Sequence, residues 1–328
     1  MANTKEIQNR INSIQDTMKI TRAMYMMSSM KLRKAKAQLE NTEPYFFALQ
    51  EQLKDVLYHF PTMQHLFFDN RDSDLKETVK RKAFLVITGD KGMAGAYNHN
   101  ILKETKALIE ASESYRLYVV GELGRHYFEG QKFNVIENFR YSASNPSIHR
   151  ARVITENLIL AYRNEEIDEV YVVYTKLSKG VKEEIEVSQL LPLKTSKFIT
   201  EELLAEAKAG VGAYSVDDLE NGRSDYLLYP SPKQVVETLV ENYVTGFVYG
   251  ALVESFASEE NARMMAMQSA TDNAEEILKE LQVEFNRVRQ AAITQEITEV
   301  IGGAKALRKK KAKKKKLSEK QRDALQSY

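Results

Sequence analysis

Two long stretches of the sequence carry apolar residues at alternating steps of three and four, the spacing of a helix that packs against one partner helix. The first stretch covers residues 4 to about 58. Within it, Thr21, Ser28 and Ala35 lie seven residues apart, where small side chains let a partner backbone approach closely. The stretch therefore predicts a long helix with a coiled-coil seam. The predicted seam consists of Ile7, Ile11, Ile14, Met18, Thr21, Tyr25, Ser28, Leu32, Ala35 and Leu39.

The second stretch begins at Ser231-Pro232-Lys233-Gln234, which has a serine at the N-cap, proline at the first helical position and glutamine to close a capping box. No proline follows before Leu307, so a helix over this range would be about 110 Å long. That length exceeds the diameter of any domain this chain could build, so we expect the helix to project. Its predicted seam consists of Met264, Met267, Thr271, Ala274, Leu278, Leu281, Phe285, Val288 and Ala292.

Beyond Ala292 the apolar residues move to another face of the predicted helix. Ile293, Ile297, Val300 and Ile301 lead to Gly302-Gly303, and we expect an apolar surface other than the seam partner to receive this tip. Because the two seams lie at opposite ends of the chain, the simplest arrangement is an antiparallel pair of terminal helices. The C-terminal helix is longer, so its tip should extend beyond the N-terminus as a single helix.

Between the two helices, from about residue 81 to 229, short β-rich runs alternate with helical segments, which indicates an open α/β sheet. The predicted strands are residues 83–88, 117–120, 169–175 and 184–189, and the predicted helices are residues 97–111, 121–130 and 147–163. Residues 200–224 are polar and glycine-containing, which predicts a surface loop. The fold class is therefore an α/β domain plus a long antiparallel coiled coil. The predicted divisions are residues 1–60, 61–230, 231–307 and 308–328.

Composition narrows the class of protein. The chain of 328 residues is 43% hydrophobic and 28% charged, which suits a soluble protein, and no apolar run is long enough to predict a membrane span. We expect no signal peptide, because the N-terminus leads directly into the first helical pattern. The absence of cysteine excludes disulfides and thiolate metal sites.

Charge is distributed unevenly. Residues Arg308 to Lys316 contain eight basic side chains and no acidic one, and removing eight from the net charge of +1 leaves −7 for the remainder. Mutual repulsion predicts that this run is extended, whereas Leu317 to Leu325 could regain helix.

The segment Ile87 to Asn98 (ITGDKGMAGAYN) is the part that most resembles a catalytic site. A glycine-rich turn between a strand and a helix can bind phosphate. However, Gly89, Gly92 and Gly95 are spaced differently from the common nucleotide-binding motifs, so a structural turn is favoured over a nucleotide site. Five scattered histidines give no metal-binding spacing, and we expect neither a catalytic site nor a cofactor in this chain.

Polar residues on the predicted helices offer possible contact surfaces. Arg289 and Gln290 lie just off the C-terminal seam, and a basic band on the first helix consists of Lys31, Arg33, Lys34 and Lys36. Each group is either a solvated helix face or a surface for a partner.

Four segments together resemble the gamma subunit of F-type ATP synthases: residues 7–36, 87–98, 257–274 and 285–304. The resemblance spans residues 1 to about 307 in the same order. It implies that the terminal helices form an asymmetric coiled coil inside a hexamer of α and β subunits. It further implies that a Rossmann-like middle domain forms a foot on the membrane c-ring, with an epsilon subunit as another partner.

The resemblance also assigns roles to residues. Arg263, Arg289 and Gln290 match shaft positions that engage a catalytic β subunit, and the stretch from Met24 to Lys34, with Lys31, matches the part facing an acidic lever of β. The bearing tip would consist of Ile293, Ile297, Val300 and Ile301.

Three departures from the family pattern stand out. Gly89 stands where the family usually has serine or threonine, and Ala94-Gly95-Ala96 stands where it has Cys-Gly-Gly. Residues 308–328 extend past the usual end of the family near Leu307.

The function implied by the resemblance is that of a central rotor subunit, peripheral to the cytoplasmic face of a bacterial cell membrane. It would couple H+ or Na+ flow to ATP synthesis or hydrolysis at β, without nucleic acid or a membrane span of its own. Two alternatives remain at this point: a coiled-coil tether or scaffold with an α/β head, and a nucleotide-dependent enzyme. Co-purification with α and β subunits would discriminate against the tether, and ATP binding by the isolated chain would support the enzyme.

Overall fold

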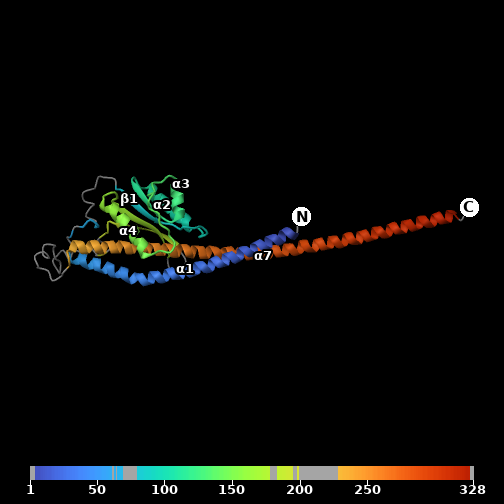
Figure 1. Ribbon diagram of the computed structural model, residues 1–328, viewed down its shortest axis with the longest axis horizontal. Coiled ribbons are helices and arrows are strands. Elements are labelled where there is room, and N and C mark those ends of the chain that lie inside the picture. The colour runs from blue at the N-terminus through green and yellow to red at the C-terminus, as the bar shows by residue number, and fades with distance from the viewer. Residues whose placement is uncertain are drawn as a thin grey trace. The chain divides into compact units, whose positions relative to one another are not determined.

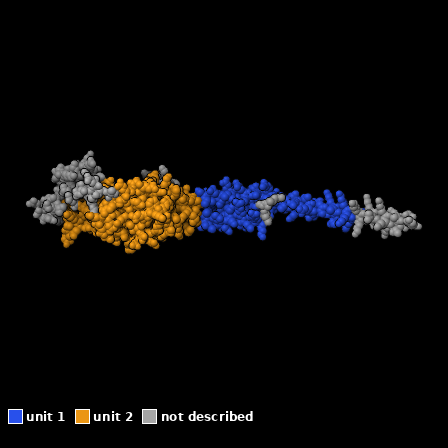
Figure 2. All heavy atoms as spheres, turned by 90° about the horizontal axis from the view of Figure 1, so that it is seen from above, with its two compact units in different colours: residues 1–23, 268–328 blue, residues 24–267 orange. Residues whose placement is uncertain are grey.

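The computed structural model describes residues 4–60, 63, 65–68, 80–177, 183–194, 198 and 228–325. The chain divides into two compact units, one of residues 1–23 and 268–328 and one of residues 24–267 (Figure 2). Two long helices, α1 (Thr4–His59) and α7 (Pro232–Leu325), contribute to both units (Figure 1). The loop predicted for residues 200–224 lies outside the described residues.

The larger unit contains a four-stranded sheet in the order β2-β1-β3-β4. Its strands are β1 (Lys82–Ile87), β2 (Tyr115–Val120), β3 (Glu169–Leu177) and β4 (Glu183–Leu191). The central strand β1 runs parallel to β2 and β3, and β4 pairs antiparallel with β3 at one edge. The predicted open α/β sheet is confirmed, with an antiparallel edge that the sequence pattern did not specify.

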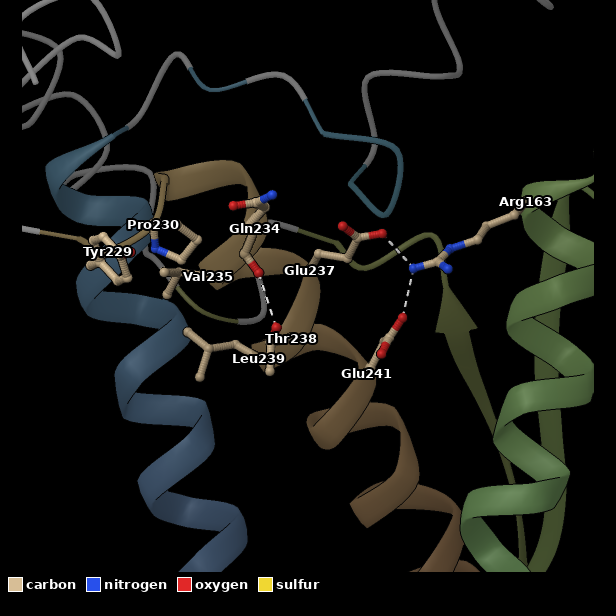
Figure 3. Close-up of a pocket in the computed structure, with 9 residues that line it drawn as sticks. All are labelled: Arg163, Tyr229, Pro230, Gln234, Val235, Glu237, Thr238, Leu239 and Glu241. Carbon is tan, nitrogen blue, oxygen red and sulfur yellow. Dashed lines mark hydrogen bonds and ion pairs between the residues drawn. The ribbon is translucent and has the colours of Figure 1, made fainter. Parts of the chain in front are cut away.

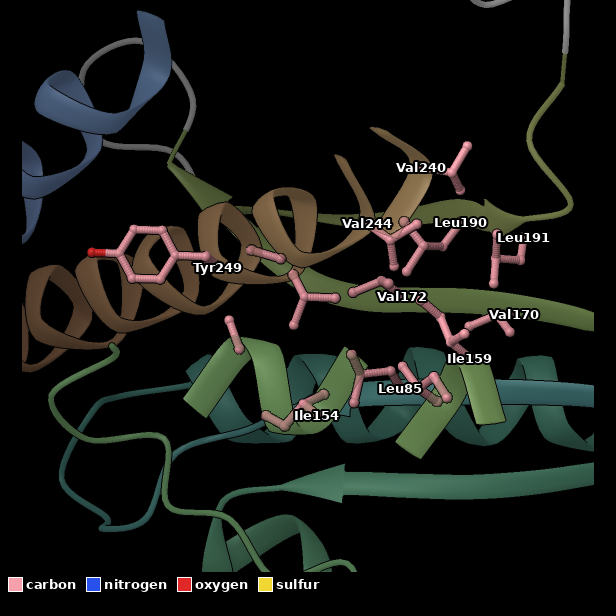
Figure 4. Packing of buried hydrophobic residues seen from close by; sticks show 14 of the residues in the cluster. Leu85, Ile154, Ile159, Val170, Val172, Leu190, Leu191, Val240, Val244 and Tyr249 are labelled. Carbon is pink, nitrogen blue, oxygen red and sulfur yellow. The ribbon is translucent and has the colours of Figure 1, made fainter. Parts of the chain in front are cut away.

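Both faces of the sheet are covered, as the apolar sequence of β1 requires. Successive β1 side chains enter two different cores: Leu85 and Ile87 join one cluster, whereas Phe84 and Val86 join another. The second cluster includes residues of α2 (Tyr97–Glu110) and α3 (Glu122–Gly130). The first includes residues of α4 (Ile148–Arg163), α1 and α7. Figure 4 shows part of this core, with side chains of α4 and α7 near the strands.

The start of α7 confirms the predicted serine N-cap but not the predicted capping box. Ser231 Oγ accepts a hydrogen bond from the Gln234 backbone N–H at 3.4 Å and donates one to Gln234 Oε1 at 3.4 Å. The first bond satisfies one backbone donor that the first helical turn leaves without a partner, and it places the N-cap at Ser231 and the helix start at Pro232. The second bond joins the two side chains, so it differs from the bond to the Ser231 backbone N–H that a capping box uses. The first part of α7 then packs on the sheet through Val236, Val240 and Val244.

In the smaller unit, α1 and α7 form the predicted seam. Ile7, Ile11 and Leu281 are buried together, with Leu278, Phe285 and other seam residues packed against them. Further along α1, Thr21 Oγ1 lies 2.7 Å from Thr271 Oγ1. The earlier residues Ile7 and Ile11 of α1 thus contact Leu281, whereas the later residue Thr21 contacts the earlier residue Thr271 of α7. The two helices are therefore antiparallel, as predicted. Apolar packing and this buried hydroxyl pair hold the two helices in register.

The C-terminal part of α7 differs from the prediction in two ways. Ala292 is exposed, as are all residues from 291 to 312, so the seam ends at Val288. The described part of α1 begins at Thr4, and no other helix of the described chain covers α7 beyond the seam. The predicted single-helix overhang is thus confirmed, whereas the inclusion of Ala292 in the seam is wrong.

The prediction of an extended lysine run is also wrong, because α7 continues through it to Leu325. Lysine, arginine, alanine and leucine are strong helix formers, and no proline interrupts the sequence after Pro232. Adding residues to an existing helix avoids the cost of nucleation. These local preferences outweigh the repulsion between neighbouring cations.

Candidate functional site

Arg263 of α7 lies at the centre of a buried charged cluster in the larger unit. Its side chain is 10% exposed. Its guanidinium Nη2 lies 2.5 Å from Glu259 Oε1, and Nη1 lies 3.0 Å from Glu260 Oε1, one helical turn before it. Lys31 Nζ of α1 donates to the same Glu260 oxygen at 3.1 Å. The cluster, which we call the Arg263 cluster, consists of Lys31, Glu259, Glu260 and Arg263 and joins α1 to α7.

The Arg263 cluster also holds the loop that follows β1. Arg263 Nη2 donates to the backbone carbonyl oxygens of Lys91 and Gly92, each at 3.4 Å. The guanidinium therefore joins α7 to the glycine-rich loop directly, and α1 is connected to it through Glu260, which pairs with both Arg263 and Lys31. Five N–H donors in a fixed planar fork suit arginine to this multiple contact, which lysine could not reproduce.

Burial determines the electrostatics of this cluster. It raises the pKa of the Glu259 carboxyl above its ordinary value, although Arg263 opposes the rise. Burial alone would lower the pKa of Arg263, but the Glu259 and Glu260 carboxylates more than offset it and raise that pKa. Glu260 Oε2 is buried and has no hydrogen-bond partner among the described residues. Glu259 thus depends on Arg263 as its cation, whereas Glu260 is compensated by Arg263 and Lys31 together.

The glycine-rich loop is anchored by a second carboxylate. Asp90 accepts hydrogen bonds from the hydroxyls of Ser142 and Ser144 and from the backbone N–H groups of Ala143 and Ser144. Burial alone would raise the pKa of Asp90, but these bonds lower it below its ordinary value. Asp90 therefore acts as a structural tie between two loops.

Gly89 is explained by the neighbouring Arg263 cluster. A Cβ at this position would lie 2.9 Å from Glu259 Oε1 and 3.0 Å from its Cδ, too close for an ordinary contact. The Gly89 backbone N–H instead donates to Asn98 Oδ1 at 2.8 Å. The departure from the serine or threonine of the family pattern thus leaves room for a carboxylate.

Three of the predicted contact residues line one surface hollow of about 180 Å³: Met24, Lys31 and Arg263. Met24 is half-buried and Lys31 is exposed, whereas Arg263 forms the inner wall. Exposed Met27 and Met93 lie at the same hollow. Lys34 is exposed but does not line it. The structure therefore brings together part of the predicted contact surface.

The remaining predicted residues lie in the smaller unit, on the single-helix part of α7. Arg289 and Gln290 are exposed, just past the last seam residue Val288. The tip residues are also exposed and, at helical spacing, share one face of α7. This apolar stripe, the tip stripe, consists of Ile293, Ile297, Val300 and Ile301.

The comparisons with known proteins cover nearly the whole chain. The model of the family described as ATP synthase matches residues 3–307. An ATP synthase gamma chain from Acetivibrio thermocellus is 41% identical over 308 residues, covering 94% of this chain and 100% of the relative. The chain belongs to the ATP synthase gamma family.

Solved structures share the fold of this chain over most of its length. A chain in the Euglena gracilis mitochondrial ATP synthase, OSCP/F1/c-ring, rotational state 3, matches with a TM-score of 0.64 at 15% identity, covering 93% of this chain and 94% of that chain. A chain in the rotor of the same organism's enzyme, rotational state 1, matches with a TM-score of 0.58 at 15% identity, covering 88% and 98%.

Sequence reasoning missed Glu259, Glu260 and Asp90 as organising residues of this gamma-family chain. The only signal for the first two was their position four and three residues before Arg263, a spacing that places opposite charges on one helix face. Such a pair is normally solvated. Their importance comes from burial under the loop after β1, which no local pattern reveals.

A larger pocket of about 630 Å³ at the start of α7 contains none of the predicted site residues. Its single cation, Arg163 of α4, bridges Glu237 and Glu241 of α7, with Nη2 2.6 Å from Glu241 Oε1 (Figure 3). That arrangement fixes α4 to α7 and leaves the guanidinium paired, so the pocket adds no evident chemistry to the gamma-family chain.

The loop after β1 is expected not to bind nucleotide. Asp90 and Glu259 place carboxylates at the turn where a phosphate would have to lie, and the Gly89 N–H is already bonded to Asn98. Titration calorimetry of the isolated full-length chain with Mg-ATP should show no saturable binding, with a nucleotide-binding protein as the positive control. Saturable micromolar binding would support the enzyme interpretation instead.

Proposed function

We propose that this chain is the central rotor subunit of an F-type ATP synthase, coupling ion flow through a membrane c-ring to ATP synthesis or hydrolysis on β subunits. The observation that carries the proposal is α7, which leaves its partner helix after Val288 and presents an exposed apolar tip stripe within a gamma-family chain. An exposed stripe on a projecting helix requires a partner outside the chain.

Coupling would depend on the asymmetry of the shaft. The two helices differ in sequence on every exposed face, so three identical β subunits around them would meet different side chains at any moment. A shaft can bias a site toward one state only by contacting the states unequally. As the shaft turns, each β subunit would meet a different side of it in succession, and its affinity for nucleotide would change accordingly. The tip stripe suits a bearing, because apolar contact is non-directional.

In this proposal the coiled coil lies inside a hexamer of α and β subunits, and the α/β domain is the foot that contacts the c-ring and an epsilon subunit. The chain would be peripheral to the cytoplasmic face of a bacterial cell membrane. Among the described helices, none combines the length and apolar character that crossing a bilayer requires. The tether alternative would need the same coiled coil but no α and β partners.

The contact with β is proposed to run through two surfaces. The first is the hollow with Met24 and Lys31, together with neighbouring Lys34, where exposed cations and polarizable methionines could meet an acidic partner. Arg263 would act there by holding the hollow in shape, since its own charges are used internally. The second is the pair Arg289 and Gln290, which could form a polar catch beside the end of the seam.

The polar catch gives an experiment that tests the function. A tag on this chain is expected to purify α and β subunits with ATPase activity, and Arg289→Ala/Gln290→Ala is expected to lower turnover without preventing assembly. Loss of charge-assisted hydrogen bonds worth about 1.5–3 kcal/mol would reduce turnover by roughly 10- to 100-fold if the bonds form only in the rate-limiting state.

Gln295→Ala is the matched control, since Gln295 is exposed on the same helix but, five residues after Gln290 and six after Arg289, points to another side. It should leave turnover near that of the unmodified chain. An intact complex with unchanged turnover in the double variant would remove the catch from the mechanism, and a tagged chain free of α and β would contradict the rotor function.

A further inference from the structure

The C-terminal segment, residues 308–328, lies outside the part of the chain shared with its family. The family match ends at residue 307, and the Acetivibrio thermocellus relative is matched over its whole length while covering 94% of this chain. A rotor function common to the family therefore does not require this segment. Any function of residues 308–328 is therefore separate from the function that the family shares.

The segment begins as a direct continuation of the shaft. α7 runs without interruption through Gly302 and Gly303 to Leu325. The helical residues 308–325 add about 27 Å to the single helix beyond the tip stripe. Residues 308–312 are exposed, and no described element packs against them. The addition thus places charge at a defined distance along the helix axis.

The helical backbone distributes the positions of the basic run around its whole axis. Eight of the nine residues from Arg308 to Lys316 are basic, and nine residues make about two and a half helical turns. Ala312 is the only uncharged position, so the run, which we call the cationic collar, has no apolar face to seat against an apolar sleeve. Unpaired cations are too costly to bury, so the collar must lie in water or against anions.

We propose that the cationic collar binds an acidic protein surface on the stationary subunits of the same complex, just beyond the apolar bearing. This inference rests on the proposed rotor function. Lipid is disfavoured because the proposed function assigns the contact with the membrane ring to the α/β domain and places the bearing tip, which precedes the collar, within the hexamer. Nucleic acid is disfavoured because residues 308–325 contain no aromatic side chain for stacking on bases.

The distribution of charge determines what this contact does. Cations on every side of a helix attract a surrounding acidic surface almost equally at each angle of rotation, so the attraction changes little as the shaft turns. It resists withdrawal of the shaft along its axis much more than it resists rotation. The collar therefore retains the rotor in the hexamer, and salt weakens it because exposed charges are screened within about 10 Å at 0.1 M ionic strength.

The test compares complexes purified with the unmodified chain, a variant with the eight basic residues of the collar changed to glutamine, and a matched variant with its lysines changed to arginine. Glutamine keeps helix propensity and removes charge, whereas arginine keeps both. The half-life of rotor dissociation from the hexamer is measured at low and high salt. Several exposed ion pairs should make it about three- to tenfold longer at low salt for the unmodified and arginine chains than for the glutamine chain.

At high salt the three half-lives should converge. A carbodiimide that joins lysine to carboxylate should also link the unmodified tail to a stationary subunit at low salt only. Equal half-lives at low salt would overturn the proposal, as would cross-links confined to this chain or tail-dependent capture of RNA or anionic vesicles by the whole complex. Failure of all three chains to assemble with α and β would instead contradict the proposed function.

Discussion

Replacing Arg263 with methionine is expected to lower the free energy of unfolding by about 3–5 kcal/mol, which is the usual cost of breaking a buried ion pair from one side. Methionine keeps much of the side-chain volume but leaves Glu259 without its cation and Glu260 with only Lys31. The hydrogen bonds to the Lys91 and Gly92 carbonyl oxygens are lost as well. Denaturant unfolding of the full-length chain measures the effect.

The same substitution should change the pH dependence of stability. Burial already raises the pKa of Glu259 in the folded chain, and removing Arg263 removes the main opposing interaction. A carboxyl with a raised folded pKa binds its proton more tightly in the folded state. The resulting loss of stability is therefore absent below the ordinary carboxyl pKa and grows as pH rises through the raised folded value. Arg263→Met should be most destabilised near neutral pH and should recover as the solution is acidified.

Two further variants separate charge from packing. Adding Glu259→Gln and Glu260→Gln to Arg263→Met should restore most of the stability at neutral pH and flatten the pH profile, because no uncompensated carboxylate remains in the cluster. Arg287→Met, at an exposed arginine of the same helix, should change stability by no more than about 0.5 kcal/mol. An Arg263→Met chain that is equally destabilised at every pH would show that charge compensation is not the role of Arg263.

The seams of the two long helices could be predicted because their cause is local. Spacing of three and four places Ile7, Ile11 and Leu281 on stripes narrow enough for one partner, and burying both stripes requires an antiparallel pair. The strands could be predicted for a similar reason: the continuous apolar sequence of β1 suits a strand covered on both faces. In each case the apolar pattern within the helix or strand itself indicates which of its faces are buried.

The errors arose where the outcome depends on distant residues or on competing effects. Ala292 continues the seam in sequence, but whether it is buried depends on how far α1 reaches. The collar combines strong helix propensity with strong repulsion, and sequence alone gave too much weight to repulsion. The resemblance assigned Arg263 a contact with β, but the sequence carried no sign that its guanidinium is enclosed by carboxylates and a loop from elsewhere in the chain.

Gly246 is another residue whose role only packing explains, since a glycine inside a helix normally costs about 1 kcal/mol relative to alanine. A Cβ added to Gly246 would lie 1.4 Å from Cε1 of Phe46, a partly buried residue of α1 that packs against the main core. The aromatic ring therefore lies directly against the backbone of α7. The glycine allows the two helices to approach each other at this point.

Gly246→Ala is accordingly expected to destabilise the chain by about 1–3 kcal/mol, because the ring of Phe46 must move out of its place against α7. The matched control is Gly250→Ala, one helical turn further along α7, where an added Cβ meets nothing within 4 Å. That substitution should stabilise the chain by about 0.5–1 kcal/mol through helix propensity alone. Thermal and denaturant unfolding of the two single variants give the comparison.

The decisive measurement is the effect of Gly246→Ala in a Phe46→Ala background. With the ring removed, the added methyl group has no atom to overlap, and only the propensity gain remains. The same substitution should therefore change sign, from destabilising with phenylalanine present to stabilising by about 0.5–1 kcal/mol without it. If Gly246→Ala stabilises the unmodified chain as Gly250→Ala does, the ring moves aside freely and the close approach of α1 to α7 does not depend on this glycine.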